Sequence, residues 1–431
     1  MKIKTIVVFE HESLCVGDGE GEISQAEYDS LLRFHETVES KFFLIERRRI
    51  KFKHYVGIIQ LGHLAIEVLP KVDKEDESKS KWHDALLRMI KISKNIKSHT
   101  TNDATVSLAK QSLLDVYFEY FLEECQSLMK TGLRKKYSYN EGNLSTLKGK
   151  ILFNHDLKKN SSNKAKVYCR HQVFDLNHDI HSALKMALAI TKDVTRSGEL
   201  VSKAKSLLIT LPDSIKPTIS MSKLQRIKLD RTTKRYDKAL QLATLIIKAY
   251  CPTNSTGSHS VIAFMFDMNK LYEEFVFKMV RSALIDTEFE VLRKKKKFWE
   301  GKEIKPDIVI TNGEKTIVID TKWKVPKEGI PADDDLKQIY VYNHYFNSPV
   351  SFLLYPKCKE GKESSEMAFA GRYHLPITIN GESVKSFCVI QTLEMFNLPS
   401  RLDLLEIKIQ LRELVTSMHV DSHEEESDKI A

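Results

Sequence analysis

Three side chains in the second half of the chain, Asp307, Asp320 and Lys322, have the types and spacing of a metal-dependent hydrolytic site. The sequences KPDIVI and KTIVIDTKWK are predicted to pair as strands, because Asn312-Gly313 lies between them and favours a type I′ hairpin turn. The hairpin places Asp307 near the start of one strand and Asp320 near the end of the other. Lys322 follows two residues later, on the same strand face as Asp320.

Two converging carboxylates are the hard oxygen ligands that Mg²⁺ prefers, with Mn²⁺ as the alternative ion. Such an ion lowers the pKa of a bound water and neutralises charge on a phosphodiester. Lys322 would orient or deprotonate the attacking water, or stabilise the phosphate. The alternative interpretation is an ordinary amphipathic hairpin. The apolar residues before Asp320 favour the site, because an unpartnered carboxylate at the end of a buried strand is costly to ionise.

Pro306-Asp307 followed by Asp320-Thr321-Lys322 resembles the PD-(D/E)XK nuclease pattern. This resemblance implies a further carboxylate on the helix before the hairpin. Residues 267–280, DMNKLYEEFVFKMV, are predicted to form that helix, because apolar residues recur at helical spacing. Glu273 is the candidate to complete the metal shell or activate water, and Glu274 is its competitor.

Gln338 and Tyr342 are spaced four residues apart in DLKQIYVYNHYF and are expected on one helix face. The Q-x-x-x-Y spacing resembles the additional motif of RecB-like nucleases, which implies that the pair lies beside the metal site. The alternative is a polar and aromatic helix pair without a catalytic role.

The ordered set of motifs resembles the McrC family, the nuclease subunits of McrBC-type modification-dependent restriction systems. The matching stretches lie between about residues 60 and 345: LAIEVLPKV, NLSTLKGKI, RYDKALQLA, MNKLYEEFV, PDIVI with IDTKWK, and LKQIYVYN. One departure is that His178 and His181 stand where an Asn-centred turn is expected before a helix.

This resemblance implies an endonuclease that cuts double-stranded DNA and is activated by an McrB-like AAA+ GTPase forming a hexameric ring. The partner would read 5-methylcytosine and hydrolyse GTP, as the chain contains no G-x-x-x-x-G-K-[ST] phosphate-binding loop. Two alternatives remain: a stand-alone PD-(D/E)XK nuclease, and a non-catalytic scaffold that stimulates the GTPase of the ring.

The composition suits a globular protein with a polyanionic partner. The 431 residues carry a formal net charge of +9, and lysine and arginine displace counterions from phosphate backbones. The six cysteines are scattered without a C-x-x-C pair, which indicates reduced thiols in a cytoplasmic protein. No stretch reaches membrane-spanning length, so no membrane association is expected.

The predicted fold class is α+β with several domains. Residues 1–75 are expected to form a β-rich domain that, by the resemblance, docks onto the partner. A mainly helical region (82–250) and an α/β PD-(D/E)XK nuclease domain of restriction-endonuclease type (258–418) follow. Residues 419–431 form an acidic tail that is expected to be disordered.

Four consecutive lysines precede the hairpin, within residues 290–297, which are predicted to form one strand. Side chains alternate along a strand, so two of the four would face the active side and hold DNA phosphates. The alternative is an edge strand that lysines protect from aggregation. The candidate DNA-binding residues are Lys294, Lys295, Lys296 and Lys297.

Overall fold

The computed structural model describes residues 4–17, 19, 21–38, 41–62, 64–71, 79–93, 113–162, 164–251, 261–324, 326, 330–357, 369–379, 382–397 and 401–417. The chain divides into two units whose segments alternate along the sequence. Unit 1 comprises Met1–Gly57, Leu64–Lys110 and Met265–Ala431, and unit 2 comprises Ile58–His63 and Gln111–Phe264. The predicted tail, residues 419–431, lies outside the described residues. The four-part division by residue range stays a prediction.

The first part of unit 1 is rich in strands. Its elements are β1 (Lys4–Phe9), β2 (Ser13–Cys15), α1 (Gln25–Val38), β3 (Phe43–Glu46), β4 (Arg49–Phe52), β5 (Tyr55–Leu61, which continues into unit 2), β6 (Leu64–Leu69) and α2 (Lys79–Ser93). Strands β1 and β6 pair in parallel, and β2, β4 and β3 form a separate antiparallel sheet. Helix α1 begins with a capping box, since the backbone N–H groups of Ser24 and Glu27 each donate to the other residue's side chain.

The second part of unit 1 is built around a six-stranded sheet of order β12-β15-β16-β17-β21-β18. Its strands are β12 (Glu290–Leu292), β15 (Ile308–Thr311), β16 (Thr316–Thr321), β17 (Val350–Lys357), β18 (Phe369–Arg372) and β21 (Phe387–Glu394). Its helices are α10 (Met268–Ala283), α11 (Asp333–Phe346) and α12 (Leu404–Ser417). Short hairpins complete it: β13 (Lys296–Trp299) with β14 (Lys302–Ile304), β19 (Ile377–Ile379) with β20 (Glu382–Val384), and β22 (Phe396–Asn397) with β23 (Arg401–Leu402).

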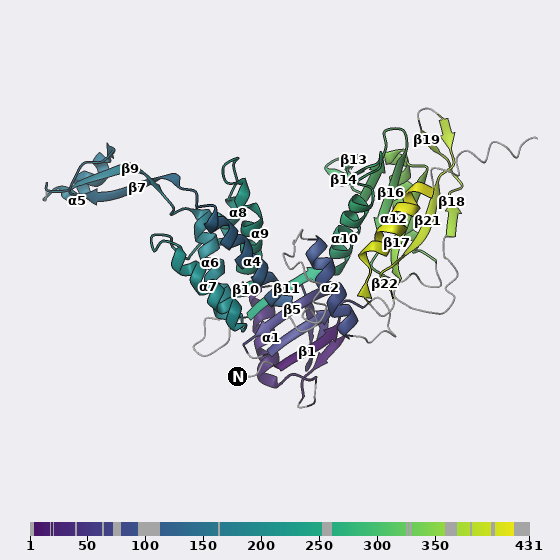
Figure 1. The fold of residues 1–431 in the computed structure, drawn as a ribbon, viewed down its shortest axis with the longest axis horizontal. Helices are drawn as coiled ribbons and strands as arrows, with labels where there is room; N and C mark the ends of the chain where they lie inside the picture. Colours follow the sequence, from purple (N-terminus) through teal and green to yellow (C-terminus); the bar gives the residue numbers. More distant parts are fainter. Residues whose placement is uncertain are drawn as a thin grey trace, which may run out of the picture. The chain divides into compact units, whose positions relative to one another are not determined.

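Helices cover both faces of this sheet. Val309, Val318 and Leu353 alternate onto one face and form a buried cluster with Ile339 and Tyr342 of α11. The neighbouring isoleucines of β15 and β16 point to the other face, where α10 contacts β16 and α12 contacts β21. Helix α11 joins β16 to β17, which pair in parallel, as a crossover helix does. The predicted mixture of helices and sheets is confirmed (Figure 1).

Two local predictions around the hairpin were wrong. Residues 290–297 do not form one strand: β12 ends at Leu292, and β13 pairs with β14 in a separate hairpin. The consecutive lysines account for the break, because alternate side chains of a strand within this sheet would be buried. The turn after β15 is a four-residue loop, and only Gly313 has positive φ (96°). The Asn312 side chain accepts hydrogen bonds from the N–H groups of Glu314 and Lys315 instead.

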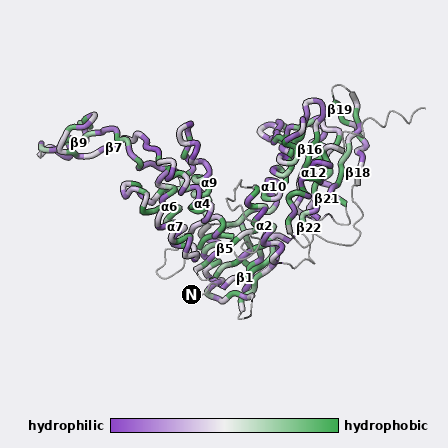
Figure 2. The backbone as a smooth tube through the Cα atoms, viewed as in Figure 1, coloured by the Kyte–Doolittle hydropathy of each residue, from purple (hydrophilic) through white to green (hydrophobic). Residues whose placement is uncertain are grey.

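Unit 2 is mainly helical. Its elements are α4 (Leu113–Lys130), β7 (Lys136–Leu144), β8 (Lys150–Ile151), α5 (Phe153–Asn160), β9 (Val167–Asp175), α6 (Asp179–Val194), α7 (Gly198–Thr210), α8 (Met221–Arg226), η1 (Lys234–Tyr236), α9 (Asp237–Ala249), β10 (Tyr250–Cys251) and β11 (Val261–Asp267, which continues into unit 1). Helix α6 packs against both α7 and α9. Hydrophobic and hydrophilic residues alternate along these helices, as amphipathic packing requires (Figure 2).

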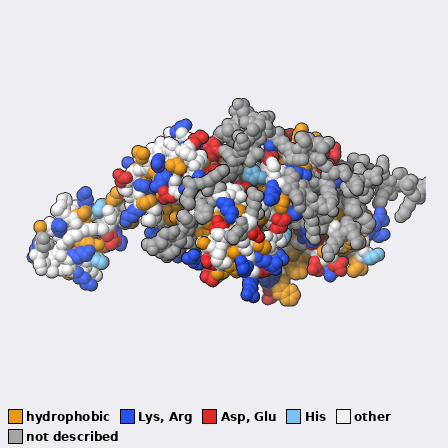
Figure 3. All heavy atoms as spheres, turned by 90° about the horizontal axis from the view of Figure 1, so that it is seen from below, with side chains coloured by type: hydrophobic (Ala, Val, Ile, Leu, Met, Phe, Trp, Pro, Cys, Tyr) orange, Lys and Arg blue, Asp and Glu red, His pale blue; other side chains and the backbone are white. Residues whose placement is uncertain are grey.

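Strands β7, β9 and β8 form an antiparallel sheet with α5, here called the arm. A strand at β9 was not predicted. Gly149, within the L-K-G-K motif, has φ of 67°, and a Cβ there would lie 2.3 Å from the Arg170 carbonyl oxygen. The arm exposes large apolar side chains, and lysines and arginines lie among them (Figure 3, left). These apolar residues are Tyr137, Tyr139, Leu147, Phe153, Leu157 and Phe174.

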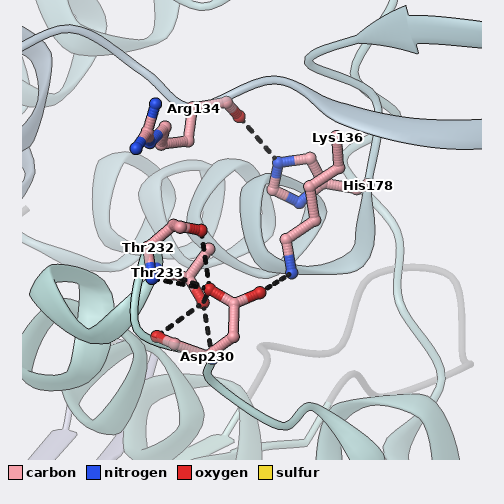
Figure 4. A network of polar contacts seen from close by, with 6 residues as sticks. All are labelled: Arg134, Lys136, His178, Asp230, Thr232 and Thr233. Carbon is pink, nitrogen blue, oxygen red and sulfur yellow. Dashed lines mark hydrogen bonds and ion pairs between the residues drawn. The ribbon is translucent and has the colours of Figure 1, made fainter.

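A polar network lies where the arm joins the helices (Figure 4). Asp230 accepts hydrogen bonds from Thr232 and Thr233, which hold its pKa well below the ordinary value, and it pairs with Lys136 at 3.5 Å. Nε2 of His178 lies 3.0 Å from the Arg134 carbonyl oxygen. His178 and the buried His181 therefore have structural partners here; Nε2 of His181 lies 3.1 Å from the Tyr236 hydroxyl.

Among the described residues, no helix combines the length and the apolar character needed to cross a bilayer.

Candidate active site

The hairpin of β15 and β16 brings Asp307 and Asp320 together. Ile308 pairs with Ile319, so the next residues outward, Asp307 and Asp320, are opposite each other at the same end of the sheet. By alternation, both carboxylates and Lys322 lie on the face that α11 covers. The structure therefore brings these three predicted residues to one face at one end of the sheet.

The Asp307 carboxylate is held by its neighbour across the hairpin. Its Oδ2 accepts hydrogen bonds from the backbone N–H of Thr321 at 2.8 Å and from the Thr321 hydroxyl at 2.7 Å. Two donors on one oxygen fix the carboxylate and leave its other oxygen available for a ligand. No role for Thr321 was predicted from the sequence, although it lies within the matched D-T-K motif.

Asp320 is 3% exposed. Burial and, after it, the nearby charge of Asp307 raise its pKa, and Lys322 lowers it; the net result is a pKa of about 7. The Lys322 ammonium lies 2.8 Å from Oδ2 of Asp320. A buried carboxylate whose pKa is raised, beside a second carboxylate, is an arrangement that a divalent cation would stabilise.

Lys322 is held by three side chains. Its Nζ donates to Oε1 of Gln338 at 2.9 Å and lies 2.8 Å from Asp320 and 3.2 Å from Asp335. Burial lowers the pKa of Lys322, but the two carboxylates outweigh burial and the net shift is upward. The lysine is therefore a positioned cation in this structure.

Asp335 is a site residue that sequence reasoning missed. It lies in the first turn of α11, pairs with Lys324 at 2.6 Å as well as with Lys322, and is buried. Burial raises its pKa, but the two lysines outweigh burial and the net shift is downward. The available signal was its position three residues before Gln338, which places both on one helix face.

Gln338 and Tyr342 interact as their spacing predicted. The Gln338 amide donates to the Tyr342 hydroxyl at 2.6 Å, and that hydroxyl donates to the Lys305 carbonyl oxygen at 3.3 Å. Burial raises the pKa of Tyr342 to about 12, so the hydroxyl stays protonated. The pair thus connects Lys322 to the backbone just before Asp307.

Glu273, the first of the two helix carboxylates, interacts electrostatically with Asp307. Burial raises its pKa, and the charge of Asp307 is the next cause. Arg293 lies 3.4 Å from Glu273 and 2.8 Å from Glu274, and Glu274 also lies 3.9 Å from Lys278. The assignment of Glu273 stays a prediction.

The residues fit a two-carboxylate metal site. Mg²⁺ is usually held by one or two carboxylates and completes its shell with waters and substrate phosphates, which suits Asp307 and Asp320. Among the described residues, no three acidic, histidine or cysteine side chains come together closely enough to hold a metal. Glu273 therefore does not join the two aspartates in a three-ligand cluster here.

The four consecutive lysines have different surroundings. Lys295 pairs with Glu303 at 2.7 Å, and Nζ of Lys296 donates to the Tyr345 carbonyl oxygen. Lys294 and Lys297 are exposed. DNA binding by these residues stays a prediction.

Comparison with known proteins gives one family and a fold. A family model described as "McrBC 5-methylcytosine restriction system component" matches residues 50–356. No curated protein matches the chain.

The similar solved structures include the following two. One is described as a half-complex from a tetradecameric assembly of Thermococcus gammatolerans McrB AAA+ hexamers with bound McrC; it is 19% identical, with a TM-score of 0.63, covering 96% of this chain and 100% of that chain. The other is the Thermococcus gammatolerans McrBC complex, at 19% identity and a TM-score of 0.45, covering 65% of this chain and 88% of that chain. The first comparison shows a shared fold.

Proposed function

Because the chain belongs to the family of McrBC 5-methylcytosine restriction system components, we propose that it is the DNA endonuclease subunit of such a system. The observation that carries this proposal is the register that sets Asp307 opposite Asp320, with Lys322 bound to Asp320 at 2.8 Å. This is the constellation of a PD-(D/E)XK nuclease, and the reaction is hydrolysis of phosphodiesters in double-stranded DNA.

Asp307 and Asp320 would hold Mg²⁺ or Mn²⁺, and Glu273 would complete the shell or activate water. The bound ion supplies a more acidic water and neutralises charge on the phosphate. Thr321 fixes the Asp307 carboxylate, while Gln338 and Asp335 hold the Lys322 ammonium beside Asp320. From that position the ammonium orients the attacking water or stabilises the negative charge that develops on phosphate oxygens.

We further propose that the chain works with an AAA+ ring that hydrolyses GTP. The similar solved chain belongs to an assembly of McrB AAA+ hexamers with bound McrC, and this chain lacks a phosphate-binding loop of its own. The ring would supply recognition of methylated DNA and activate cleavage.

Asp320→Ala tests the nuclease site. With the AAA+ partner, GTP and Mg²⁺, the unaltered chain is expected to cut methylated DNA, and the variant should lose cleavage while still binding the ring. Omitting the partner or GTP should abolish cutting by the unaltered chain.

Each other outcome supports an alternative. Cutting without the partner indicates a stand-alone nuclease. An unaltered chain that stimulates GTP hydrolysis but never cuts indicates a scaffold, and cleavage by Asp320→Ala contradicts the assigned site.

A further inference from the structure

We propose that the β13–β14 hairpin holds duplex DNA beside the cleavage site, with lysines on the phosphate backbone and the Trp299 indole in a groove. This proposal rests on the proposed nuclease function. It adds a contact surface whose central residue is an aromatic side chain that plays no part in the chemistry.

The position of the hairpin follows from strand register. Leu292, the last residue of β12, pairs with Val309, so the chain leaves the six-stranded sheet at the end where Asp307 and Asp320 lie. After β14, only Lys305 and Pro306 precede Asp307. DNA placed for cleavage at the two aspartates therefore passes close to the hairpin.

One face of the hairpin is braced against α11. The Phe298 and Tyr345 rings meet edge to face at 5.7 Å, and Lys296 lies 5.3 Å from the centre of the Phe346 ring. The Tyr342 hydroxyl donates to the Lys305 carbonyl oxygen at the base of the hairpin. Helix α11 also carries Gln338, which binds Lys322. These contacts with α11 therefore fix the position of the hairpin relative to Lys322.

The side chains at the tip of the β13–β14 hairpin are exposed. Trp299 is 73% exposed, and Lys297 and Lys302 are exposed and form no ion pair with any described residue. Residues 294–305 contain six lysines and two glutamates. Of the glutamates, Glu303 pairs with Lys295, and Glu300 lies beside Trp299 at the turn.

This combination favours DNA over a protein partner. Free lysines near a scissile phosphate contact the backbone irrespective of base sequence. Proteins that bind the minor groove insert apolar side chains between or against base steps. An exposed tryptophan also occurs at protein interfaces, but these are depleted in lysine. Protein docking is therefore an outcome that the test must separate from DNA binding.

The first measurement is binding of a fluorescein-labelled 30-bp duplex to the full chain in EDTA, with and without the AAA+ partner and GTP analogue. Trp299→Ala and Lys302→Glu are each expected to weaken binding about tenfold, and Lys302→Glu to lower the salt slope by about one. Because EDTA removes the metal, the result is independent of cleavage.

Two matched controls should bind like the unaltered chain. Ile285→Ala removes another exposed apolar side chain, which precedes β12. The first residue of β12 pairs with Thr311, beside the turn between β15 and β16 and far from Asp307. Lys385→Glu reverses an exposed charge just before β21, whose first residue pairs with the start of β17, also at the far end of the sheet.

Intrinsic fluorescence supplies an independent measurement. Of the three tryptophans, Trp82 and Trp323 are 0% and 9% exposed, so acrylamide quenching reports mainly on Trp299. Duplex DNA is expected to protect this emission, and Trp299→Phe should remove the protected component.

Unchanged DNA affinity of both hairpin variants, or equal quenching with and without DNA, would overturn the proposal. Reduced binding to the AAA+ ring at unchanged DNA affinity would show instead that the hairpin is a protein interface. Cleavage by Asp320→Ala would remove the assigned nuclease site and leave the hairpin result standing. If the unaltered chain does not bind DNA either with or without the AAA+ partner, the nuclease proposal and the hairpin proposal are both contradicted.

Discussion

The indole Nε1 of Trp323 donates a hydrogen bond of 2.8 Å to Oε1 of Glu10, a residue 313 positions earlier in the chain. Trp323 directly follows Lys322, and Glu10 directly follows β1. The same Glu10 oxygen accepts from the Lys71 backbone N–H at 2.9 Å, after β6. The parallel pair of β1 and β6 is therefore bonded to the residue next to the site lysine.

Trp323→Phe removes this hydrogen bond and keeps most of the buried aromatic surface. We expect a loss of stability of about 1–3 kcal/mol, because Glu10 loses a donor in a buried setting. On the proposed function, kcat for DNA cleavage should fall several-fold with DNA affinity unchanged, since Lys322 is less well positioned. Urea unfolding and single-turnover cleavage measure the two effects.

Trp82→Phe is the matched control. Trp82 is fully buried and packs edge to face on Trp323 at 6.2 Å, but its N–H has no hydrogen-bond partner among the described residues. Its replacement changes packing without removing a hydrogen bond. Equal loss of kcat in the two variants would show that packing, and not the bond to Glu10, positions the site.

Glu10 also predicts a pH dependence of stability. Burial raises its pKa from 4.5 to about 7. Between about pH 4.5 and 7, Glu10 binds more protons in the folded chain than in the unfolded chain. Its contribution to stability is therefore fully present below about pH 4.5 and is lost as the pH rises through 7. A shift of this size corresponds to about 3 kcal/mol lost by pH 8.

Glu10→Gln should keep both hydrogen bonds and remove this contribution. Urea unfolding between pH 4.5 and 8 should then show a shallower decline than in the unaltered chain. The decline persists in part, because burial raises the pKa of Glu67 to about 7 with the same sign. An unaltered slope in Glu10→Gln would mean that Glu10 is ionised in the folded chain.

The site could be predicted from sequence where its geometry is local. Strand alternation relates Asp320 to Lys322, a hairpin relates Asp307 to Asp320, and helical spacing relates Gln338 to Tyr342. The hydrogen bond between Glu10 and Trp323 was not predicted, because it depends on how β1 packs in the folded unit. The periodic spacing of residues within a strand or helix carries no information about such a long-range contact. Asp335 was missed because the first turn of a helix commonly carries acidic residues that complement the helix dipole, which hides a site carboxylate among ordinary ones.

Gln338→Ala should show whether Gln338 positions Lys322 for cleavage or contacts DNA. The variant removes the neutral partner of Lys322 and leaves its two carboxylates, so the ammonium can move away from the productive position. We expect kcat to fall about tenfold, as one lost charge-assisted hydrogen bond implies, with DNA affinity unchanged. Lys337→Ala, an exposed neighbour on α11, is the control. A change in DNA affinity in place of kcat would assign Gln338 to DNA contact.

The pair Glu273→Gln and Glu274→Gln decides which helix carboxylate serves the site. Both side chains are partly exposed on adjacent positions of α10, both lie near Arg293, and both changes remove one charge with little change in size. The charge of Asp307 raises the pKa of Glu273, so the Glu273 change should raise the Mg²⁺ concentration needed for half-maximal cleavage, or abolish cleavage. Glu274→Gln should cut at the unaltered rate. Metal titrations of cleavage measure both, and the reverse pattern would assign the role to Glu274.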